Sequence, residues 1–329
     1  MEVVIQPLNR VIRVAPGANL LQALQAARVP MSYSCMAGRC GTCRCRVIGG
    51  DVIDQGGAEQ QSPFSRRDGY VLACQTYITE PCTIEIPEPD EVVVHPARIL
   101  KAVVVALESL THDIKRLVLN PGKPFDYSPG QYVQLQFTPD CSRPYSLAGL
   151  SSQQELEFHV RLIPDGRVSG YVDRSLKVGD TVKVSGPLGS AYLRRKHQGP
   201  ILCVAGGTGL APILSIVRGA VSGGMKNPIH LYFGVRSPRD IYGMDWLDEL
   251  RSQHRRLKTQ IIVTSGGNPR TQRCGVVTDA IEHDLPELTG WRAYVCGSPP
   301  MVEAVTLLAR RLGVLPDQLY ADAFYAQGA

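Results

Sequence analysis

The run Ser34–Cys43, SCMAGRCGTC, decides the fold of the first part of the chain, because it carries three cysteines at a fixed spacing. Cys35, Cys40 and Cys43 follow the pattern C-x4-C-x2-C, and Cys74 follows further along the chain. This pattern is typical of a [2Fe-2S] cluster, in which one loop supplies three thiolates and a distant cysteine the fourth. A zinc site or scattered buried thiols are the alternatives. Structural zinc usually shows two C-x2-C pairs, whereas this loop has one.

The glycines of the loop support the cluster interpretation. Gly38 and Gly41 have no Cβ, so they can adopt positive φ and bring backbone N–H groups toward the sulfurs of an anionic cluster. With these residues the motif resembles the plant-type ferredoxin family. The resemblance implies a β-grasp-like domain over residues 1–91. Within it we expect a hairpin near residues 3–14 and a helix over residues 20–27 with Asn19 as its cap.

Length and composition predict a soluble multidomain protein. A chain of 329 residues is too long for one ordinary core, and 44% hydrophobic with 20% charged residues is typical of globular proteins. With 6% aromatics and a net charge of only +5, nucleic-acid binding has little support. The cysteines outside the motif are isolated, which indicates a reducing cytosol rather than a disulfide framework. No signal peptide or long apolar run is present, so we expect a cytoplasmic protein without a membrane partner.

The remaining chain divides into two further predicted domains. Residues 92–197 carry short alternating strands separated by glycine and proline, a pattern that favours an antiparallel β-barrel. Residues 198–329 alternate apolar strands with helical patterns, which favours a parallel sheet covered on both faces. The fold class we expect is therefore multidomain, with α+β and α/β parts.

The barrel segment contains the run RPYSLA at residues 143–148. This run resembles the R-x-Y-S signature of the ferredoxin–NADP reductase superfamily. The resemblance implies that Arg143 and Pro144 belong to a flavin site, with Arg143 on the flavin phosphate, Tyr145 against the isoalloxazine ring and Ser146 near its N5 edge. A guanidinium fork suits phosphate oxygens, and a flat aromatic side chain can stack on a ring system. The alternative is a surface strand with an exposed arginine.

A second run, VRLIPDGRVS at residues 160–169, resembles the other flavin element of that superfamily. In that element a glycine and a serine present backbone N–H groups to the pyrophosphate. The residues implied are Val160, Leu162, Gly166, Val168 and Ser169. The resemblance implies FAD rather than FMN, because reductases with an N-terminal ferredoxin domain usually hold FAD.

The third run, GGTGLAP at residues 206–212, follows a strand and opens a helix, so its amides and the helix dipole form a phosphate cradle. Pro212 replaces the third glycine of G-x-G-x-x-G, so the simple Rossmann fingerprint is not met. The form instead resembles the ferredoxin reductase family. It implies nucleotide contacts at the turn and at the later run CGSPPM of residues 296–301. The residues concerned are Gly207, Thr208, Gly209, Cys296 and Gly297.

Three further interpretations concern the same site. We assign Cys296 a site-lining, catalytic role, although it could simply pack. Phe324, near the C-terminus, is our candidate for the aromatic ring that covers the flavin face, although it could belong to the core. In a nucleotide domain an acid after the second strand binds the ribose 2′-OH, but the run GVRSPR at residues 234–239 has no acid before Asp240. We therefore expect NADH as donor, NADPH also accepted, and Arg236 as the contact to the extra phosphate.

Together these motifs resemble the reductase components of bacterial aromatic-ring-hydroxylating oxygenases, including the naphthalene dioxygenase type. The resemblance implies a ferredoxin–NAD(P)+ reductase of the EC 1.18.1 type that passes electrons from NAD(P)H through FAD and a [2Fe-2S] cluster. Its partners would be a Rieske-type ferredoxin and, through it, a terminal oxygenase. The alternatives are a two-component reductase of the benzoate dioxygenase type and, as a different class, a redox-sensing protein without turnover. No C-x-H pair or H-x3-H cluster is present, so the chain is not expected to activate oxygen.

The basic residues beside the cluster loop suggest how a partner docks. Arg39, Arg44 and Arg46 make this face locally basic, so an acidic partner face would be attracted to it. The alternative is that these arginines are merely solvated.

Overall fold

The computed structural model describes residues 1–27, 29, 31, 38, 43–55, 69–86, 93 and 95–325. It divides into two compact units, Met1–Val94 and His95–Ala329. The predictions for Cys35, Cys40, Gly41 and Arg39 lie outside the described residues.

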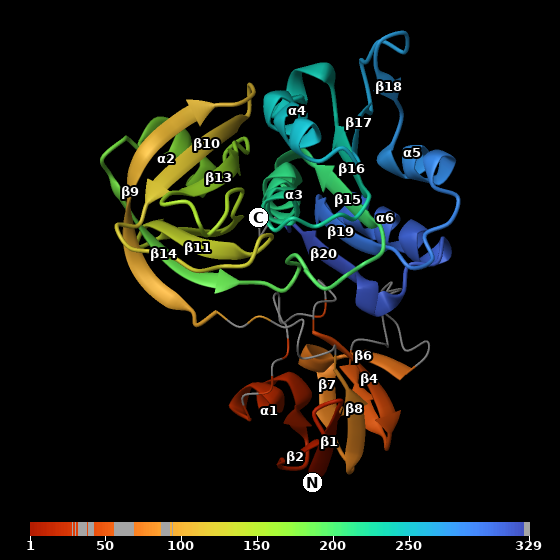
Figure 1. Cartoon of the computed structure of the whole chain (residues 1–329). Coiled ribbons are helices and arrows are strands. Elements are labelled where there is room, and N and C mark those ends of the chain that lie inside the picture. Colours follow the sequence, from red (N-terminus) through yellow and green to blue (C-terminus); the bar gives the residue numbers. More distant parts are fainter. Residues whose placement is uncertain are drawn as a thin grey trace. The chain divides into compact units, whose positions relative to one another are not determined.

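The first unit is built on a sheet with the strand order β2-β1-β8-β4-β6 (Figure 1). The expected hairpin is β1 and β2, which pair antiparallel, and β1 pairs parallel with β8. This mixed sheet is the β-grasp arrangement that the sequence predicts. The strands are β1 (Glu2–Gln6), β2 (Arg10–Arg13), β4 (Arg44–Gly49), β6 (Tyr70–Leu72) and β8 (Cys82–Glu85).

Among the described residues of this unit, an α-helix and a small second sheet pack with the first sheet. Helix α1 (Leu20–Ala26) begins where Asn19 caps it, because the Asn19 side chain accepts a hydrogen bond from Gln22 N at 3.2 Å. Its buried leucines join the core beneath the first sheet. The second sheet has the order β3-β7-β5, with strands β3 (Ala18–Asn19), β5 (Val52–Asp54) and β7 (Thr76–Ile78).

The second unit begins with the expected antiparallel barrel, whose strand order is β12-β11-β14-β9-β10-β13. The two end strands close on each other through a bridge between Leu147 and Phe158. Helix α2 (Arg167–Arg174) follows β13 and packs beside β12. The strands are β9 (Arg98–Ser109), β10 (Ile114–Asn120), β11 (Tyr132–Thr138), β12 (Cys141–Ser146), β13 (Leu156–Arg161) and β14 (Thr181–Leu188).

The C-terminal part is the expected parallel sheet, with the order β18-β17-β16-β15-β19-β20 and parallel pairing throughout. One apolar core lies on each face, so helices cover both sides. The strands are β15 (Ile201–Gly206), β16 (Ile229–Val235), β17 (Leu257–Val263), β18 (Arg273–Cys274), β19 (Arg292–Gly297) and β20 (Leu319–Ala323), and the helices are α3 (Leu210–Ser222), α4 (Met244–Gln253), α5 (Val277–Asp284) and α6 (Pro299–Arg311).

This order places a topological switch point between β15 and β19. The chain after β15 continues to β16 on one side, and the chain after β19 continues to β20 on the other. In open α/β sheets, ligands bind beyond the carboxyl ends of the strands at such a point. The glycine turn after β15 and the run after β19 therefore lie at one edge of the sheet.

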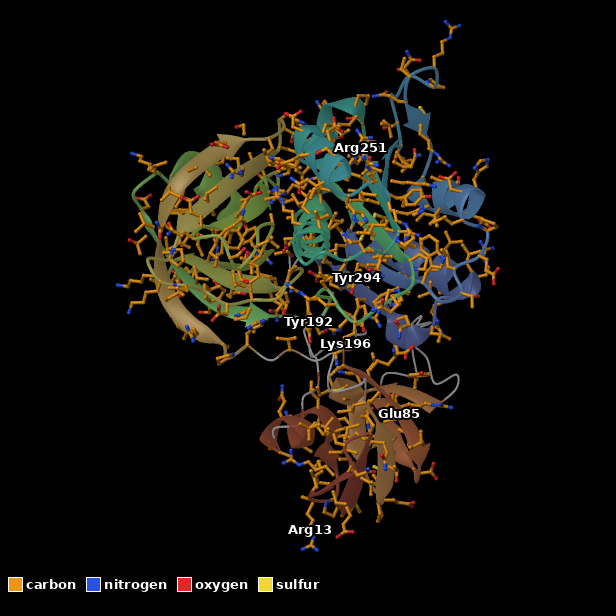
Figure 2. All side chains as sticks on the ribbon, viewed as in Figure 1. Arg13, Glu85, Tyr192, Lys196, Arg251 and Tyr294 are labelled. Carbon is orange, nitrogen blue, oxygen red and sulfur yellow. The ribbon has the colours of Figure 1, made fainter. Side chains whose placement is uncertain are left out.

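Helix α3 joins the barrel to the sheet. Ser215 Oγ donates to Gly149 O at 2.6 Å, and Arg218 Nη1 donates to Ala148 O at 2.9 Å. Elsewhere on the seam the guanidinium carbon of Arg194 lies 3.5 Å from the ring centroid of Tyr192, and Arg194 N donates to the hydroxyl of Tyr294 at 2.8 Å (Figure 2). Barrel and sheet thus form one compact unit.

Candidate active site

Two predicted cluster ligands, Cys43 and Cys74, come together in the first unit. Cys74 N donates to Cys43 Sγ at 3.4 Å, and Gln75 Nε2 lies 3.6 Å from Cys74 Sγ. Asn19 Nδ2 also donates to Cys74 O at 2.9 Å, so the residue that caps α1 holds this ligand's backbone. Donors aimed at thiolate sulfurs are what an anionic cluster requires, so this part of the site fits a [2Fe-2S] group.

Gly38 has the backbone conformation that the loop requires. Its φ is +75°, and a Cβ at this position would lie 2.8 Å from Gln75 Cγ. Gly38 therefore packs closely on the residue that follows Cys74. Only a glycine fits there without displacing the Gln75 side chain.

Cys45 differs from the predicted ligands although it lies two residues after Cys43. It is 2% exposed within the core, and burial, with smaller contributions from Cys82 and Asp54, raises the pKa of its thiol to about 12. A metal ligand must be a thiolate. Cys45 is therefore a packed side chain of the core.

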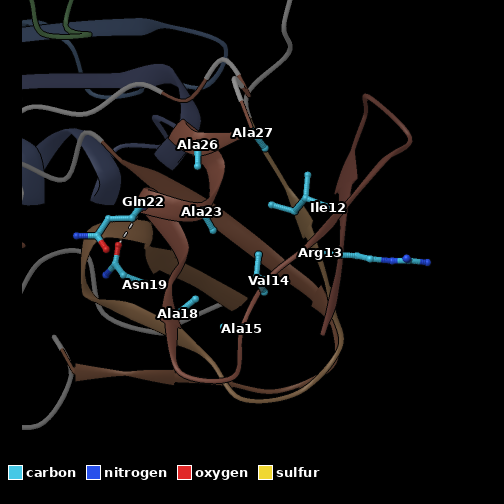
Figure 3. A pocket seen from close by; sticks show the side chains of 10 residues that line it. All are labelled: Ile12, Arg13, Val14, Ala15, Ala18, Asn19, Gln22, Ala23, Ala26 and Ala27. Carbon is cyan, nitrogen blue, oxygen red and sulfur yellow. Dashed lines mark hydrogen bonds between the residues drawn. The ribbon is translucent and has the colours of Figure 1, made fainter.

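A groove of about 590 Å³ lies between β2 and α1 (Figure 3). Its lining side chains are mostly small and apolar, such as Ile12, Val14 and Ala23. Asp, Glu, His and Cys, the usual protein ligands of a metal ion, are absent from this lining, and its one charged side chain, Arg13, pairs with Glu2 at 3.3 Å.

The predicted flavin residues of the barrel lie on adjacent elements. Tyr145 and Tyr171 both contact the ring of Phe137, with centroid distances of 6.3 and 6.1 Å, so β12 and α2 meet there. Arg143 lies near Tyr145, whose hydroxyl pKa is raised to about 12 by burial against the opposing effect of Arg143. Pro144 between them is exposed. An exposed edge of this kind can receive a flat ring and an anionic tail.

Gly166 caps α2, and Val168 and Ser169 lie in its first turn. Ser169 Oγ accepts from Ile163 N at 3.0 Å, and a Cβ on Gly166 would lie 2.5 Å from that oxygen. The serine hydroxyl therefore stabilises the turn, which leaves the amides at the helix start as the groups that suit a pyrophosphate.

The two strand residues named with this element differ in their surroundings. Val160 is wholly buried in the barrel core, so only its backbone can face a ligand. Leu162 is half-buried, and its N–H donates to Asp113 O at 2.7 Å.

The two glycine runs at the sheet edge touch each other. Gly207 has a φ of +54°, and a Cβ on Gly209 would lie 2.1 Å from Cys296 O. Gly297 has a φ of +150°, and a Cβ there would lie 3.0 Å from Gly206 O. Glycines therefore allow the turns after β15 and β19 to meet, with Thr208 half-buried between its glycine neighbours. A Cβ on Gly207 would meet only Arg161 Nη1, at 3.4 Å, so the backbone of this turn is open to a ligand, as a nucleotide phosphate requires.

Ser146 meets a residue that sequence reasoning missed. Its Oγ lies 3.4 Å from Asp322 Oδ2 on β20, and burial raises the pKa of Asp322 to about 6 against the effect of this hydrogen bond. Cys296 pairs with Asp322 in the sheet register, and its thiol is wholly buried. Phe324 N donates to Gly297 O at 2.8 Å, so the backbone of this aromatic residue lies beside the glycine run after β19. The only sequence signal for Asp322 is an acid within the run YADAFY at residues 320–325.

Arg236 lies where the sequence places it, exposed just after β16. Asp240 turns back onto Ser237, whose N–H and hydroxyl donate to Asp240 Oδ2 at 2.8 and 2.6 Å. Asp240, the first acid after β16, is therefore held against Ser237, the residue that follows Arg236.

Family models match all three parts of the chain. A 2Fe-2S iron-sulfur cluster binding domain matches residues 3–79, an oxidoreductase FAD-binding domain residues 101–192, and an oxidoreductase NAD-binding domain residues 203–306. These matches confirm the predicted cofactor classes. They define an iron–sulfur flavoprotein that oxidises a nicotinamide nucleotide.

Two relatives match over their whole length. The chain is 57% identical over 100% of both chains to the ferredoxin–NAD(P)+ reductase component of the naphthalene 1,2-dioxygenase/salicylate 5-hydroxylase systems of Ralstonia sp. It is 56% identical, again over 100% of both, to that component of the naphthalene 1,2-dioxygenase system of Pseudomonas putida. The chain therefore belongs to the family of ferredoxin–NAD(P)+ reductase components of aromatic-ring dioxygenase systems, which confirms the resemblance found in the sequence.

A solved structure supports the architecture. The Amycolatopsis cytochrome P450 reductase is 32% identical, with a TM-score of 0.73 over 98% of both chains. Across the described part of the chain, no helix has the length and apolar character needed to cross a membrane.

Proposed function

We propose that this chain is the reductase of a three-component, naphthalene dioxygenase type system and delivers its electrons to a Rieske-type ferredoxin that feeds the terminal oxygenase. Two full-length relatives from naphthalene dioxygenase systems support this choice. The proposed domains are the cluster domain of residues 1–91, the flavin domain of residues 92–197 and the nucleotide domain of residues 198–329. We place the protein in the cytoplasm, where its nucleotide donor is regenerated.

The observation that supports the proposed hydride site is the contact between Ser146 and Asp322. It joins the end of a barrel strand, where Tyr145 offers a ring face, to the sheet edge where the glycine turns meet. A flavin ring against Tyr145 and a nicotinamide above Gly297 would therefore meet at Ser146. FAD, when bound, accepts two electrons as a hydride and releases them singly to the cluster.

Each residue has a distinct task in this arrangement. Arg143 and the α2 start at Gly166 would hold the flavin phosphates, with the backbone of Val160 and Leu162 beside the ring. Ser146 would offer its hydroxyl to the reacting edge while Asp322 fixes that hydroxyl and can hold a proton on Oδ2. The wholly buried Cys296 supports the wall behind this edge, and Phe324 would cover the flavin face until the nicotinamide displaces it.

The test uses the purified holoprotein with NADH under anaerobic conditions. We expect NADH to reduce both the flavin and the cluster, and the reduced protein to transfer electrons to a purified Rieske ferredoxin of a naphthalene dioxygenase system. Direct reduction of the terminal oxygenase without that ferredoxin would instead identify a two-component reductase of the benzoate dioxygenase type. Failure to reduce any acceptor, dyes included, would leave only a redox-sensing role.

A further inference from the structure

Strand β13 presents a polar face to the nucleotide domain. Alternate residues of a strand lie on opposite faces. Phe158 and Val160 accordingly fill the barrel core, whereas Glu157, His159 and Arg161 lie on the other face. His159 is only 4% exposed, and its ring stacks on Trp246 of α4 at 5.5 Å with an interplanar angle of 18°.

A chain of polar contacts runs from this face to the glycine turn. Glu157 Oε1 lies 3.3 Å from His159 Nε2, and His159 Nδ1 lies 3.0 Å from the hydroxyl of Tyr242. The same hydroxyl lies 3.3 Å from Gly207 O. Gly207 begins the turn that meets the Cys296–Gly297 run, so the chain ends on the nucleotide cradle.

The number of hydrogen atoms available to these three contacts depends on whether His159 is protonated. Gly207 O and an ionised Glu157 can only accept, so three contacts need three hydrogens. The Tyr242 hydroxyl supplies one, and a neutral imidazole supplies one more. A neutral His159 that donates to Glu157 must therefore accept from Tyr242, and Gly207 O then receives nothing from this hydroxyl. A protonated His159 donates to both neighbours and leaves the Tyr242 hydrogen for Gly207 O.

The charged groups around the ring come from three elements. Glu157 on β13 faces it, with Arg116 on β10 at 2.9 Å from Glu157 Oε2 and Arg218 on α3 at 3.6 Å from Oε1. Burial alone would raise the pKa of Glu157, but its hydrogen bond to His159 and the two guanidiniums lower that pKa to about 2. Burial lowers the pKa of His159 against the opposing effect of Glu157. Glu157 is thus ionised throughout the range in which His159 titrates.

We propose that His159 and Tyr242 are positioning residues for the nicotinamide nucleotide, and that protonation of His159 turns the Tyr242 hydroxyl onto Gly207 O and tightens the cradle. The proposal rests on the placement of the nucleotide at the glycine turn under the proposed function. Neither residue exchanges electrons or hydride. Their effect is on nucleotide binding, stronger in acid than in base.

The test is the dissociation constant of NAD+ for the oxidised holoprotein, measured by calorimetry at pH 5 and pH 8. Tyr242→Phe keeps the ring, which packs on Phe233 and Trp246, and removes only the hydroxyl. We expect binding to weaken about three- to tenfold at pH 5 and less than about twofold at pH 8, as the loss of one hydrogen bond implies. The KM for NADH should rise in parallel, with kcat for ferricyanide reduction within about twofold of wild type.

A second variant and a matched control separate this from a general loss of packing. His159→Gln cannot titrate, so its NAD+ affinity should lose the acid-dependent part. Tyr232→Phe removes another buried hydroxyl of the same domain, one that donates to Asp284 Oδ2 at 3.1 Å on the opposite face of the sheet. It should lower stability without changing NAD+ affinity.

Two outcomes would overturn the proposal. They are an unchanged affinity of Tyr242→Phe at pH 5 and an equal loss at pH 5 and pH 8. Thr208→Glu, which puts a negative charge into the cradle, tests the placement itself and should abolish NAD+ binding. If Thr208→Glu binds normally, the proposed nucleotide site is wrong. If it fails to bind while Tyr242→Phe binds like wild type at pH 5, only the positioning role is wrong.

Discussion

The predicted cluster site and the proposed hydride site are built in opposite ways. Cys43 and Cys74, in hydrogen-bond contact, are 31 positions apart, and their spacing is visible as a motif. Ser146 and Asp322 are 176 positions apart, and only the pairing of β20 with β19 brings them together. A metal centre held by one loop can be recognised from spacing alone. A site assembled between two domains depends on contacts that no short motif records.

The largest effect should come from breaking the local site. Cys43→Ser removes a predicted thiolate, so the cluster absorbance and electron transfer to a ferredoxin should fall to background. NADH oxidation with ferricyanide should persist, because residues 95–329 form a separate compact unit with its own cores. Cys45→Ser, two residues away and equally buried, is the control that should retain the cluster. Loss of both activities in a Cys43→Ser protein that still holds FAD would disprove the linear path.

The assembled site should respond to Asp322→Asn. Stopped-flow reduction of the flavin by NADH should slow by about a hundredfold, because Asn cannot hold the proton or fix Ser146 in the same way. A rate within threefold of wild type would remove Asp322 from the site.

The same variant should be more stable than wild type at pH 7. The folded-state pKa of Asp322 is raised to about 6 by burial, so its contribution to stability is fully present below about pH 4 and lost as the pH rises through 6. Thermal unfolding should therefore show an Asn advantage at pH 7 that disappears near pH 4. An advantage that grows toward acid would contradict this sign.

The elements and motifs that act locally were predictable from the sequence. Asn19 caps a helix through its own neighbours, and the glycine turn follows directly from a strand–turn–helix pattern. Asp322 and His159 were not predictable as site residues, because their partners lie on elements far apart in the sequence. A lone acid in an apolar strand or a histidine in a barrel strand gives no signal until the topology is known.

Arg236→Ala tests the exposed end of the proposed nucleotide site, where this arginine follows β16. If this arginine binds the 2′-phosphate, kcat/KM for NADPH should fall about ten- to a hundredfold, since one charge-assisted hydrogen bond is lost. The value for NADH should move much less. An unchanged ratio of the two specificity constants would show that Arg236 points to solvent.

The smallest effect should be at the predicted docking face of the cluster domain. Arg44 lies 5.6 Å from the Tyr70 ring centroid and Arg46 lies 3.9 Å from Glu85, so both are partly engaged within the unit. Arg44→Glu should raise the KM for the acceptor ferredoxin about three- to fivefold at low salt, and the effect should fade as salt rises. Arg13→Glu, the same charge change on β2, is the control. Equal effects of both variants would argue against a specific docking face.

Strand β20 carries Asp322, so the proposed hydride site can form only when this strand is in place. β20 is an edge strand, and it is translated after every other element of the sheet. Until it has left the ribosome and paired with β19, Ser146 has no Asp322 and the glycine turn after β19 lacks its neighbour. If Asp322 acts as proposed, a chain that lacks β20 should therefore reduce the flavin with NADH about as slowly as Asp322→Asn, and the full rate should appear only once this strand has paired.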